Sequence, residues 1–282
     1  MKAEVLIPMD VTIIIGVGGM GQAIARRIGA GQQLLLADFN EELLETAAAA
    51  LRADGFQVQT AFVDVSQQDS MRELAATAFG LGPVVNAVHT AGLSPEMAPA
   101  NAIYAVDLAG VAFFLEEFGP VMAPNGAGLV IASMAGAIAA SSLPAELLDP
   151  LATLPADQLL DFPPLASAPL QDPGAAYTLS KRANQLRVQR AATAWGKHGT
   201  RVNSISPGVI STPMGQKELA GGSGAGMRAM IENSSTGRLG TPNDIANAAA
   251  FLLSADASFI SGTDLLVDGG VVAGLAVSGS KR

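Results

Sequence analysis

"VTIIIGVGGMG", residues 11–21, decides the fold that we predict for this chain. Its first six letters are a β-branched run that stops at a glycine, which is the pattern of a buried strand. Three of its glycines then follow the spacing G-x-G-x-x-G where the strand gives way to a helix, a context typical of nucleotide-binding loops, although a tight turn alone would use the same glycines. We expect a pyrophosphate to rest on this loop and on the positive end of the helix, at Gly16, Gly18, Gly19, Met20 and Gly21.

Outward from this loop, strands alternate with helices of ten or more residues. Strands are expected at 32–38, 56–65, 83–92, 127–133, 200–207 and 264–270, the last of which closes the ordered part of the chain. Helices are expected at 20–31, 41–55, 66–80, 101–122, 174–198 and 241–254, with a glycine-rich mobile stretch near 220–226. This alternation predicts βαβ units and a parallel sheet covered on both faces. Because no repeat or linker interrupts it, we predict a single α/β domain over residues 1–282, built on a doubly wound parallel sheet.

The alternation fails between residues 140 and 172. The stretch 140–174 contains seven of the sixteen prolines among short apolar clusters. Proline disrupts helix interiors and central strands, so we predict an insertion of short helices and turns there instead of another βα unit.

The composition excludes several classes of function. A net charge of −9 and the lack of a basic patch argue against a nucleic-acid partner. Cysteine is absent, and His89 and His198 stand 109 positions apart, so thiol chemistry is excluded and no metal site is expected. Glu4, Pro8 and Asp10 interrupt the stretch where a signal peptide needs an unbroken apolar run, and no run is long enough to cross a bilayer. We therefore expect a cytoplasmic protein that makes no membrane contact.

The second predicted strand ends at Asp38, 17 residues beyond Gly21. A carboxylate there can accept hydrogen bonds from both hydroxyls of an adenosine ribose and would repel a 2′-phosphate. No arginine or lysine lies in the glycine loop or in the three residues after Asp38 to offset that repulsion. We therefore predict NAD(H) in preference to NADP(H), with Phe39 beside the same site. The alternative is that Asp38 caps the next helix, although Asn40 is free to do so.

These features together resemble the short-chain dehydrogenase/reductase family, over about residues 11–270. Besides the loop, the matching segments are "HTAG" (89–92), "IASMAG" (131–136), "YTLSK" (177–181), "SPGVIST" (206–212) and "VDGG" (267–270). The resemblance implies a Rossmann fold and a Ser-Tyr-Lys active site made by Ser133, Tyr177 and Lys181. It also implies that Tyr177 and Lys181 contact the cofactor, together with Asp64, Val65, Ala91, Gly92, Pro207, Gly208, Ile210 and Thr212.

Three departures from the family pattern affect this prediction. The glycine loop is one residue shorter than usual, which leaves open which glycine approaches the phosphates. His89 and Thr90 replace two asparagines, and we expect both to hold the sheet behind the cofactor. Asp107 stands where many members carry a catalytic asparagine that helps a water chain reach the lysine. We retain Asp107 as a catalytic residue: it can substitute if the backbone carbonyl does that work, and otherwise the relay is altered.

The chemistry expected of "YTLSK" depends on two positive charges. A free tyrosine has a pKa of about 10, and lowering it by three units takes about 4 kcal/mol. Lys181 shares a helical face with Tyr177 and supplies one cation, and the nicotinamide of NAD⁺ would supply the other. Tyr177 would then exchange a proton with the substrate oxygen while Ser133 positions that oxygen. Without the nucleotide, the same pair would be an ordinary surface pair on a helix.

The substrate is expected to be a secondary alcohol or a ketone, bulky and apolar. The 44 residues between Ser133 and Tyr177 are about 30 more than the family usually has, so both ends of the insertion lie near the site. Its leucines and Phe162 either roof a pocket or pack on the protein surface. A substrate loop is expected at about 213–237, where glycines permit closure and methionines adapt to apolar shapes.

Two other functions and the oligomeric state stay open at this point. A 3-oxoacyl-type reductase and a non-catalytic NAD-binding sensor are the alternatives. Enoyl-thioester reduction usually goes with a tyrosine-to-lysine spacing of seven positions, whereas here it is four. A homo-oligomer, dimer or tetramer, is expected from the family, although an insertion at this place obstructs the usual helix-to-helix association in some carbonyl reductases.

Overall fold

A computed structural model describes residues 9–279 and contains a seven-stranded parallel sheet in the order β3-β2-β1-β4-β5-β6-β7. The chain builds one half of the sheet outward from β1 and then returns to build the other half from β4, which is the doubly wound arrangement predicted from the sequence. The strands are β1 (Val11–Ile15), β2 (Gln33–Asp38), β3 (Gln57–Phe62), β4 (Val84–His89), β5 (Met122–Ile131), β6 (Arg201–Pro207) and β7 (Asp264–Val267). Residues 1–8, with the Glu4 and Pro8 that argue against a signal peptide, and residues 280–282 lie outside the described part.

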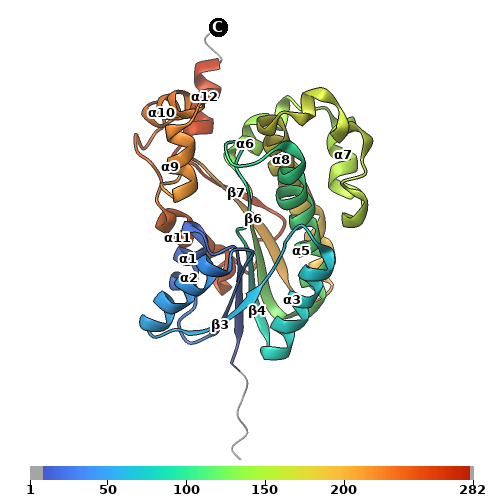
Figure 1. Cartoon of the computed structure of the whole chain (residues 1–282), viewed down its shortest axis with the longest axis vertical. Coiled ribbons are helices and arrows are strands. Elements are labelled where there is room, and N and C mark those ends of the chain that lie inside the picture. The colour runs from blue at the N-terminus through green and yellow to red at the C-terminus, as the bar shows by residue number, and fades with distance from the viewer. Residues whose placement is uncertain (1–8, 280–282) are drawn as a thin grey trace, which may run out of the picture.

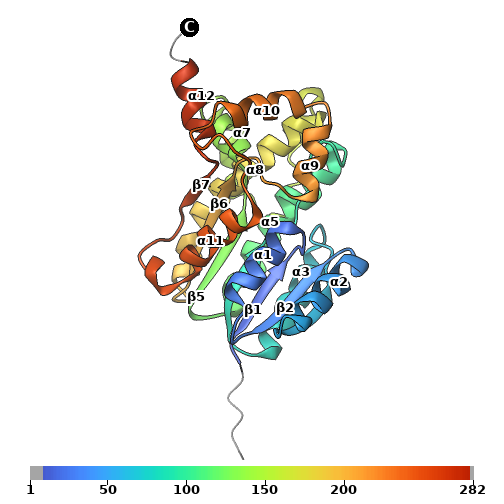
Figure 2. The same ribbon diagram turned by 90° about the vertical axis from the view of Figure 1, so that its left-hand side faces the viewer.

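Helices cover both faces of the sheet (Figures 1 and 2). One face carries α1 (Gly19–Ile28), α2 (Glu41–Ala53) and α11 (Pro242–Leu253), and the other carries α3 (Gln68–Leu81), α5 (Gly110–Phe118) and α8 (Pro173–Gly196). Each layer has its own buried cluster, because side chains alternate between the two faces of a strand: Ile14 belongs to the first cluster, and Ile13 and Ile15 belong to the second.

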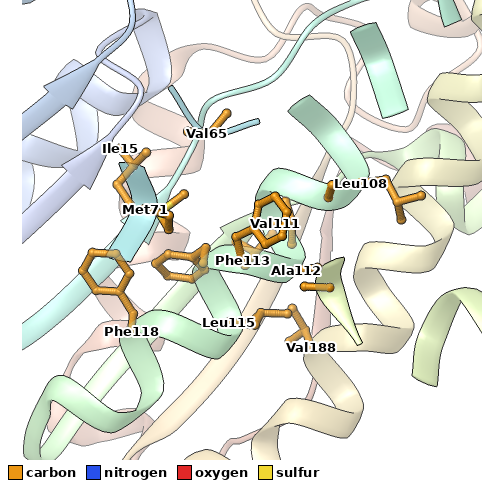
Figure 3. Packing of buried hydrophobic residues seen from close by; sticks show 14 of the residues in the cluster. Ile15, Val65, Met71, Leu108, Val111, Ala112, Phe113, Leu115, Phe118 and Val188 are labelled. Carbon is orange, nitrogen blue, oxygen red and sulfur yellow. The ribbon is translucent and has the colours of Figure 1, made fainter. Parts of the chain in front are cut away.

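The second cluster is the larger and contains the aromatic core (Figure 3). Phe114 packs between Phe118 and the indole of Trp195, with ring centroids 5.2 and 6.1 Å away. Gly128 on β5 lets that indole approach the sheet closely, since a β-carbon there would collide with the ring. The Trp195 N–H donates to the carbonyl of Leu115 at 3.0 Å, so burial of the indole leaves no polar atom unpaired.

The helix predicted over 101–122 is four elements instead of one. It consists of α4 (Ala100–Ile103), the π-helix η1 (Tyr104–Ala109), α5, and a 3₁₀ turn, η2 (Gly119–Val121). Pro120 has no N–H for a continuing helix, and β5 starts directly after the turn, five residues earlier than predicted. The wider π turn changes the direction of the side chains within the segment that contains Asp107.

The C-terminal region differs from the prediction in two places. The glycine-rich stretch near 220–226 spans the junction of two helices, α9 (Pro213–Ala220) and α10 (Gly224–Glu232), which occupy much of the predicted substrate loop. The chain also does not end its regular structure at β7, because α12 (Val271–Gly279) follows. The Asp268 carboxylate starts that helix by accepting the N–H groups of Gly270 and Val272 at 2.8 and 2.7 Å.

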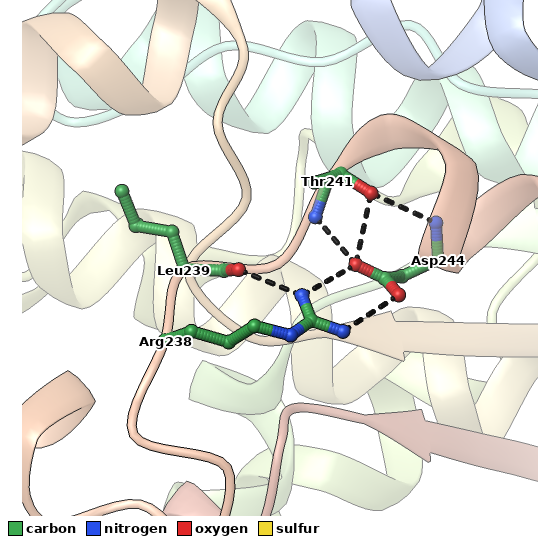
Figure 4. A network of polar contacts seen from close by, with 4 residues as sticks. All are labelled: Arg238, Leu239, Thr241 and Asp244. Carbon is green, nitrogen blue, oxygen red and sulfur yellow. Dashed lines mark hydrogen bonds and ion pairs between the residues drawn. The ribbon is translucent and has the colours of Figure 1, made fainter.

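A polar cluster fixes the segment between α10 and α11 (Figure 4). Thr241 and Asp244 form a reciprocal capping box at the start of α11. Arg238 donates to both carboxylate oxygens of Asp244, at 2.8 and 2.9 Å. These bonds hold the pKa of Asp244 below its usual range. The chain that leaves α10 is therefore tied to the helix that supports the sheet.

The insertion forms short helices, as predicted, and packs on the outer side of α5 and α8. It comprises η3 (Ala139–Ser141), α7 (Ala145–Thr153), η4 (Ala156–Gln158), η5 (Pro163–Ala166) and η6 (Ala168–Gln171). Arg187 of α8 donates to the carbonyls of Leu151 and Leu154 at 3.0 and 2.9 Å, and Glu116 of α5 accepts the N–H of Ala156 at 3.0 Å. Four leucines of the insertion are fully or nearly fully buried in the second core cluster: Leu148, Leu151, Leu159 and Leu165. It is therefore a built-in layer of the domain.

Candidate active site

The glycine loop lies at the carboxyl end of β1, next to the point where the order of strands reverses between β1 and β4. Gly16 has φ 92°, and a β-carbon there would lie 2.5 Å from the N–H nitrogen of Ala91. A β-carbon on Gly21 would collide with the Gly16 carbonyl. A β-carbon on Gly18 would touch nothing within 4 Å, so this glycine faces open space. Two glycines are thus needed for packing, and Gly18 lies where a ligand can approach the backbone.

A cavity of about 520 Å³ adjoins this loop, and we call it the glycine-loop cavity. Its wall includes Gly18, Gly19, Met20, Gly21, Thr90 and Thr212. Thr90 donates its hydroxyl to the Gly16 carbonyl at 2.7 Å, which fixes the loop as expected of this position. The N-terminus of α1 points its free N–H groups at this region, where an anion is stabilised. The cavity fits a dinucleotide pyrophosphate.

Asp38 ends β2 and contacts the loop. Its carboxylate accepts the N–H of Val17 at 2.8 Å and that of Asn40 at 2.9 Å. Asn40 caps α2 by accepting the N–H of Leu43, so Asp38 is not the helix cap. Phe39 is exposed, and its ring centroid lies 5.6 Å from that of Phe62. The sequence does not indicate Phe62 as a residue of this site. Phe62 is paired with Asp38 in the β2–β3 register, and that neighbourhood cannot be derived from a single sequence.

Further along the same edge, Asp64 and Val65 follow β3. The Asp64 carboxylate accepts the N–H and hydroxyl of Ser66 at 3.0 and 2.6 Å, so it stabilises its own turn. Val65 packs closely on α5, where a β-carbon at Gly110 would lie 2.9 Å from the Val65 carbonyl.

In the other half of the sheet, Pro207 ends β6, and the residues after it lead to Thr212. The Thr212 hydroxyl caps α9 by accepting the N–H of Gly215. Gly208, Ile210 and Thr212 line the pocket described below.

Tyr177 and Lys181 lie on one face of α8, as their spacing predicts. The Lys181 ammonium is 5.5 Å from the centre of the Tyr177 ring. Ser133 caps the short helix α6 (Met134–Ile138). Its hydroxyl lies close enough to the Tyr177 phenol to act on the pKa of that group, and both residues line the same pocket. Gly136 brings α6 against α8, since a β-carbon there would lie 2.8 Å from the Arg182 nitrogen. The three residues therefore come together at the carboxyl end of the sheet.

Asp107 is fully buried and pairs with Lys181. Its carboxylate lies 3.4 Å from the Lys181 ammonium and accepts the N–H of Leu93 at 2.7 Å. The backbone carbonyl of Asp107 accepts the Asn184 amide at 2.8 Å. Gly92 lies against the ion pair, because a β-carbon there would be 3.3 Å from the ammonium. The side chain that departs from the family pattern thus contacts the lysine directly.

Burial and charge set the protonation states of this group. Burial raises the pKa of Tyr177, Lys181 and Ser133 act to lower it, and Asp107 and Glu218 raise it again, so the pKa stays above its usual range. Burial lowers the pKa of Lys181, but Asp107 and Tyr177 outweigh burial, and the net result is a raised pKa. Burial also raises the pKa of Asp107 against the effect of Lys181. In the protein without cofactor, Tyr177 is therefore a protonated phenol beside an ammonium.

His89 is buried behind this group. Its ring packs edge-on against Phe114 at 5.4 Å, and neither ring nitrogen has a hydrogen-bond partner among the described residues. Burial, with a smaller contribution from Lys181, lowers the pKa of His89 to about 3. The imidazole is thus neutral at physiological pH and fills the space between the sheet and α5.

A pocket of about 240 Å³ opens beside Ser133 and Tyr177, and we call it the methionine pocket. Five methionines and one carboxylate line it: Met20, Met134, Met214, Met227, Met230 and Glu218. The sequence suggested adaptable methionines in this region but not Glu218, because only the folded α9 shows which of its side chains face the pocket. No residue of the insertion 140–172 lines it, so the leucines and Phe162 do not roof it.

Neither a membrane span nor a cluster of metal ligands occurs in the part of the chain that the structure describes. Between residues 9 and 279, no helix combines the length and apolar character needed to cross a membrane. Over the same residues, acidic and histidine side chains do not gather in threes as metal ligands do.

Comparison with known proteins agrees with this geometry. The family model described as short chain dehydrogenase matches residues 10–145, and the one described as enoyl-(acyl carrier protein) reductase matches residues 166–272. The chain is 40% identical over 264 residues to the short-chain dehydrogenase/reductase bsc3 of Alternaria brassicicola, covering 94% of this chain and 96% of the relative. It is 30% identical to the galactitol 2-dehydrogenase (L-tagatose-forming) of Cereibacter sphaeroides, covering 91% and 92%.

The fold also matches solved structures. A solved structure of an actinorhodin polyketide ketoreductase variant with NADPH matches with a TM-score of 0.72 at 21% identity, covering 94% of this chain and 97% of that one. The models, the relatives and the grouping of Ser133, Tyr177 and Lys181 beside a glycine loop lead to one conclusion. This chain belongs to the short-chain dehydrogenase/reductase family of oxidoreductases, which act on alcohols and carbonyl compounds with a nicotinamide cofactor.

Proposed function

We propose that this protein is an NAD-dependent oxidoreductase that interconverts a secondary alcohol and a ketone, with a bulky apolar substrate. One observation carries the proposal: the phenol of Tyr177, with Lys181 5.5 Å from its ring centre, lines a methionine-rich pocket together with Ser133. An apolar pocket with a few convergent polar groups is the usual form of a small-molecule site.

The proton chemistry belongs to Tyr177 and the residues around it. The nicotinamide cofactor, when bound, supplies or accepts the hydride. In the direction of reduction, the Tyr177 phenol donates its proton to the substrate oxygen, and in oxidation it takes that proton back. Ser133 donates a hydrogen bond to the same oxygen and positions it. Lys181 stabilises the phenolate that forms in between, through its charge.

Asp107 acts on this reaction through Lys181. A carboxylate 3.4 Å from the ammonium fixes the lysine in place and offsets part of its charge. Its effect on Tyr177 is to raise the pKa of the phenol, so the group is kept as a proton donor. The backbone carbonyl of Asp107 already accepts the Asn184 amide. Asp107 therefore serves as a positioning residue for the lysine, and it favours ketone reduction at neutral pH.

Asp38 supports the preference for NAD(H). Its carboxylate lies beside the glycine loop, where it can accept ribose hydroxyls and would repel a 2′-phosphate. Arg26, which lines the glycine-loop cavity, is paired with Asp54 at 3.1 Å and so has its charge partly satisfied. Fluorescence titration with NADH and NADPH tests this: we expect tighter binding of NADH, and tighter binding of NADPH would refute the preference.

The proposal extends to the cellular location and the oligomeric state of the protein. We place the enzyme in the cytoplasm, consistent with its lack of cysteine. We also infer a homo-oligomer, dimer or tetramer. The insertion already covers α5 and α8, but β7 is an edge strand and the rings of Phe251 and Phe259 are exposed, so the chain keeps other surfaces for association. Sedimentation velocity tests this, and a monomer at micromolar concentration would contradict it.

The experiment that tests the reaction is NADH formation from a panel of secondary alcohols, with Tyr177→Phe as the key variant. Loss of the hydroxyl removes the proton carrier without changing the ring packing, so we expect kcat/KM to fall by about 10³-fold or more. NADH binding to the variant serves as the control for folding. A variant that keeps near wild-type turnover would overturn the mechanism. A wild-type protein that binds NADH but turns over no alcohol or ketone would instead be an NAD-binding sensor.

A further inference from the structure

A single carboxylate lines the methionine pocket, whose other side chains are uncharged. Glu218 is the charged residue among those described that line it, and it shares the pocket with Ser133 and Tyr177. It lies close enough to the phenol to raise the pKa of Tyr177. A small substrate held by Tyr177 at its reacting oxygen can therefore reach Glu218 with another part of the same molecule.

The surroundings of Glu218 on balance disfavour its charge, with the Ser94 hydroxyl as the one group that acts the other way. Burial raises its pKa, and the Glu96 carboxylate raises it further. Glu218 also lies in the last turn of α9, where the helix dipole disfavours an anion. Within residues 9–279, the ion pairs include neither Glu218 nor Glu96. Three unfavourable effects thus act on one carboxylate without a basic side chain to offset them.

The polar groups that do reach this pair are hydroxyls. The buried Ser94 hydroxyl lies close enough to Glu218 to act on its pKa, and it has no hydrogen-bond partner among the described residues. The Ser223 hydroxyl donates weakly to Glu96 at 3.4 Å. Gly221 makes room for the pair, since a β-carbon there would lie 2.8 Å from the Glu96 carboxyl carbon. The fold thus holds two carboxylates together at the edge of the pocket and leaves Glu218 with acceptor capacity to spare.

From this we infer that Glu218 is a specificity residue of the reaction proposed above, one that accepts a hydrogen bond from a donor group on the substrate. The donor is a hydroxyl or a protonated amine, remote from the carbon that exchanges the hydride. The inference rests on the proposed function, because it places the reacting oxygen at Tyr177. A substrate that carries a carboxylate or phosphate at the same end is repelled by Glu218 and Glu96 together.

This assignment explains why an unfavourable carboxylate is kept in the site. A donor that enters the pocket satisfies Glu218 and gains a charge-assisted hydrogen bond away from bulk water. A substrate that lacks the donor leaves the half-buried carboxylate dehydrated and unpaired, which is the larger penalty. Selectivity between otherwise identical ketones is therefore expected to arise here, while the methionines accommodate the apolar body.

The experiment compares four ring ketones that differ at one position: cyclohexanone, 4-hydroxycyclohexanone, 4-aminocyclohexanone and 4-oxocyclohexanecarboxylate. With NADH at pH 7, we expect the wild-type kcat/KM for the hydroxyl or amino ketone to exceed that for cyclohexanone about tenfold or more. The carboxylate should fall below cyclohexanone. In Glu218→Gln, the ratio of kcat/KM for the amino ketone to kcat/KM for cyclohexanone should drop toward one, and kcat/KM for the carboxylate ketone should rise. Glu232→Gln on α10, an exposed site with the same charge change, should leave all four ratios as in the wild type.

The four ketones distinguish a cationic from a neutral donor, and they distinguish failure of the inference from failure of the proposed function. A wild-type preference for the amino ketone assigns a cationic donor, and a preference for the hydroxyl ketone alone assigns a neutral one. Equal rates for all four ketones, unchanged in Glu218→Gln, overturn the inference while leaving the oxidoreductase standing. Calorimetric Kd values for the same four ketones in the presence of NAD⁺, which has no hydride to give to a ketone, measure the selectivity without turnover. Donor-selective binding with no reaction refutes the proposed function alone, and uniform binding refutes the inference.

Discussion

Helix α8 carries two buried cations whose surroundings differ. Lys181, near its start, faces the sheet and pairs with the buried Asp107 carboxylate at 3.4 Å. Arg187, six residues later, faces the insertion and donates to the carbonyls of Leu151 and Leu154, with Glu116 at 3.5 Å. The lysine ion is thus matched by a buried charge, whereas the arginine ion is matched mainly by backbone dipoles.

These different surroundings suit Lys181 to a role in the reaction and Arg187 to a role in stabilising the fold. A compact ammonium beside a carboxylate and a phenol can change the protonation of both, because each group titrates. A guanidinium stays charged and offers a fork of donors, which suits it to satisfy the carbonyls left free near the end of α7. We therefore expect changes at Lys181 to affect the rate and its pH dependence, and changes at Arg187 to affect stability.

The largest effect is expected from Lys181→Met, which keeps most of the length of the side chain but removes its charge. The phenolate of Tyr177 loses its neighbouring cation, so kcat/KM for alcohol oxidation should fall by about 10³-fold. NADH formation from the best secondary alcohol measures the loss.

Thermal denaturation of the same variant distinguishes a chemical role from a folding defect. Asp107 is left without its partner but can become protonated, since burial already raises its pKa. A folded Lys181→Met enzyme that keeps more than a tenth of the wild-type rate would remove the lysine from the mechanism.

Arg187→Met should lower the free energy of unfolding by about 3 kcal/mol, since two buried carbonyls lose their donor. The rate per folded molecule should change little, because the insertion does not line the methionine pocket. Urea denaturation at pH 7 measures the stability. Arg190→Met on the same helix is the matched control: that side chain is exposed and lies 4.0 Å from Asp149, so its loss should cost less than about 0.5 kcal/mol. An equal loss in the free energy of unfolding for the two variants would contradict a stabilising role that is specific to Arg187.

The fold and the placement of Tyr177 beside Lys181 follow from the sequence because local signals and chain order agree. The strand, glycine turn and helix at residues 11–28 fix the nucleotide end of the sheet, and periodicity gives the other βα units. Tyr177 and Lys181 share a face because helical spacing requires it. Asn40 is the cap of α2, as the interpretation of Asp38 as a ribose ligand requires.

What the sequence leaves out depends on contacts between distant segments. The pairing of Asp107 with Lys181 joins η1 to α8, and Arg187 reaches carbonyls 36 and 33 positions away. The helicity of 213–232 does not follow from the sequence because clustered glycines suggest mobility, whereas Gly221 and Gly224 lie at the ends of helices. Glu218 could not be distinguished from its neighbours, since only the packing of α9 shows which side chains face the pocket.

His89 adds a third buried titratable group to the comparison, one without a hydrogen-bond partner among the described residues. Its pKa of about 3 lies below the 6.5 of an unfolded histidine, so its neutral form stabilises the fold fully above pH 6.5 and progressively less as the pH falls toward 3. Between pH 7 and pH 5 this loss amounts to about 2 kcal/mol. Urea denaturation at both pH values should show it in the wild type but not in His89→Asn. The exposed His198→Asn serves as the control, and an unchanged pH dependence in His89→Asn would show that the ring is not buried neutral.

The smallest effect, and the finest test of the lysine side of α8, is expected from Asp107→Asn. The amide oxygen can still accept the Leu93 N–H, so the loop stays in place while the negative charge is removed. Asp107 raises the pKa of Tyr177, so its neutralisation should lower that pKa. Oxidation, which needs the phenolate, should then reach its plateau at a lower pH than in the wild type, and reduction, which needs the phenol, should also decline at a lower pH. Profiles of kcat/KM from pH 6 to 10 measure both limbs. A shift to higher pH would mean that Lys181 has lost its proton along with its partner, and that Asp107 acts by keeping the lysine charged.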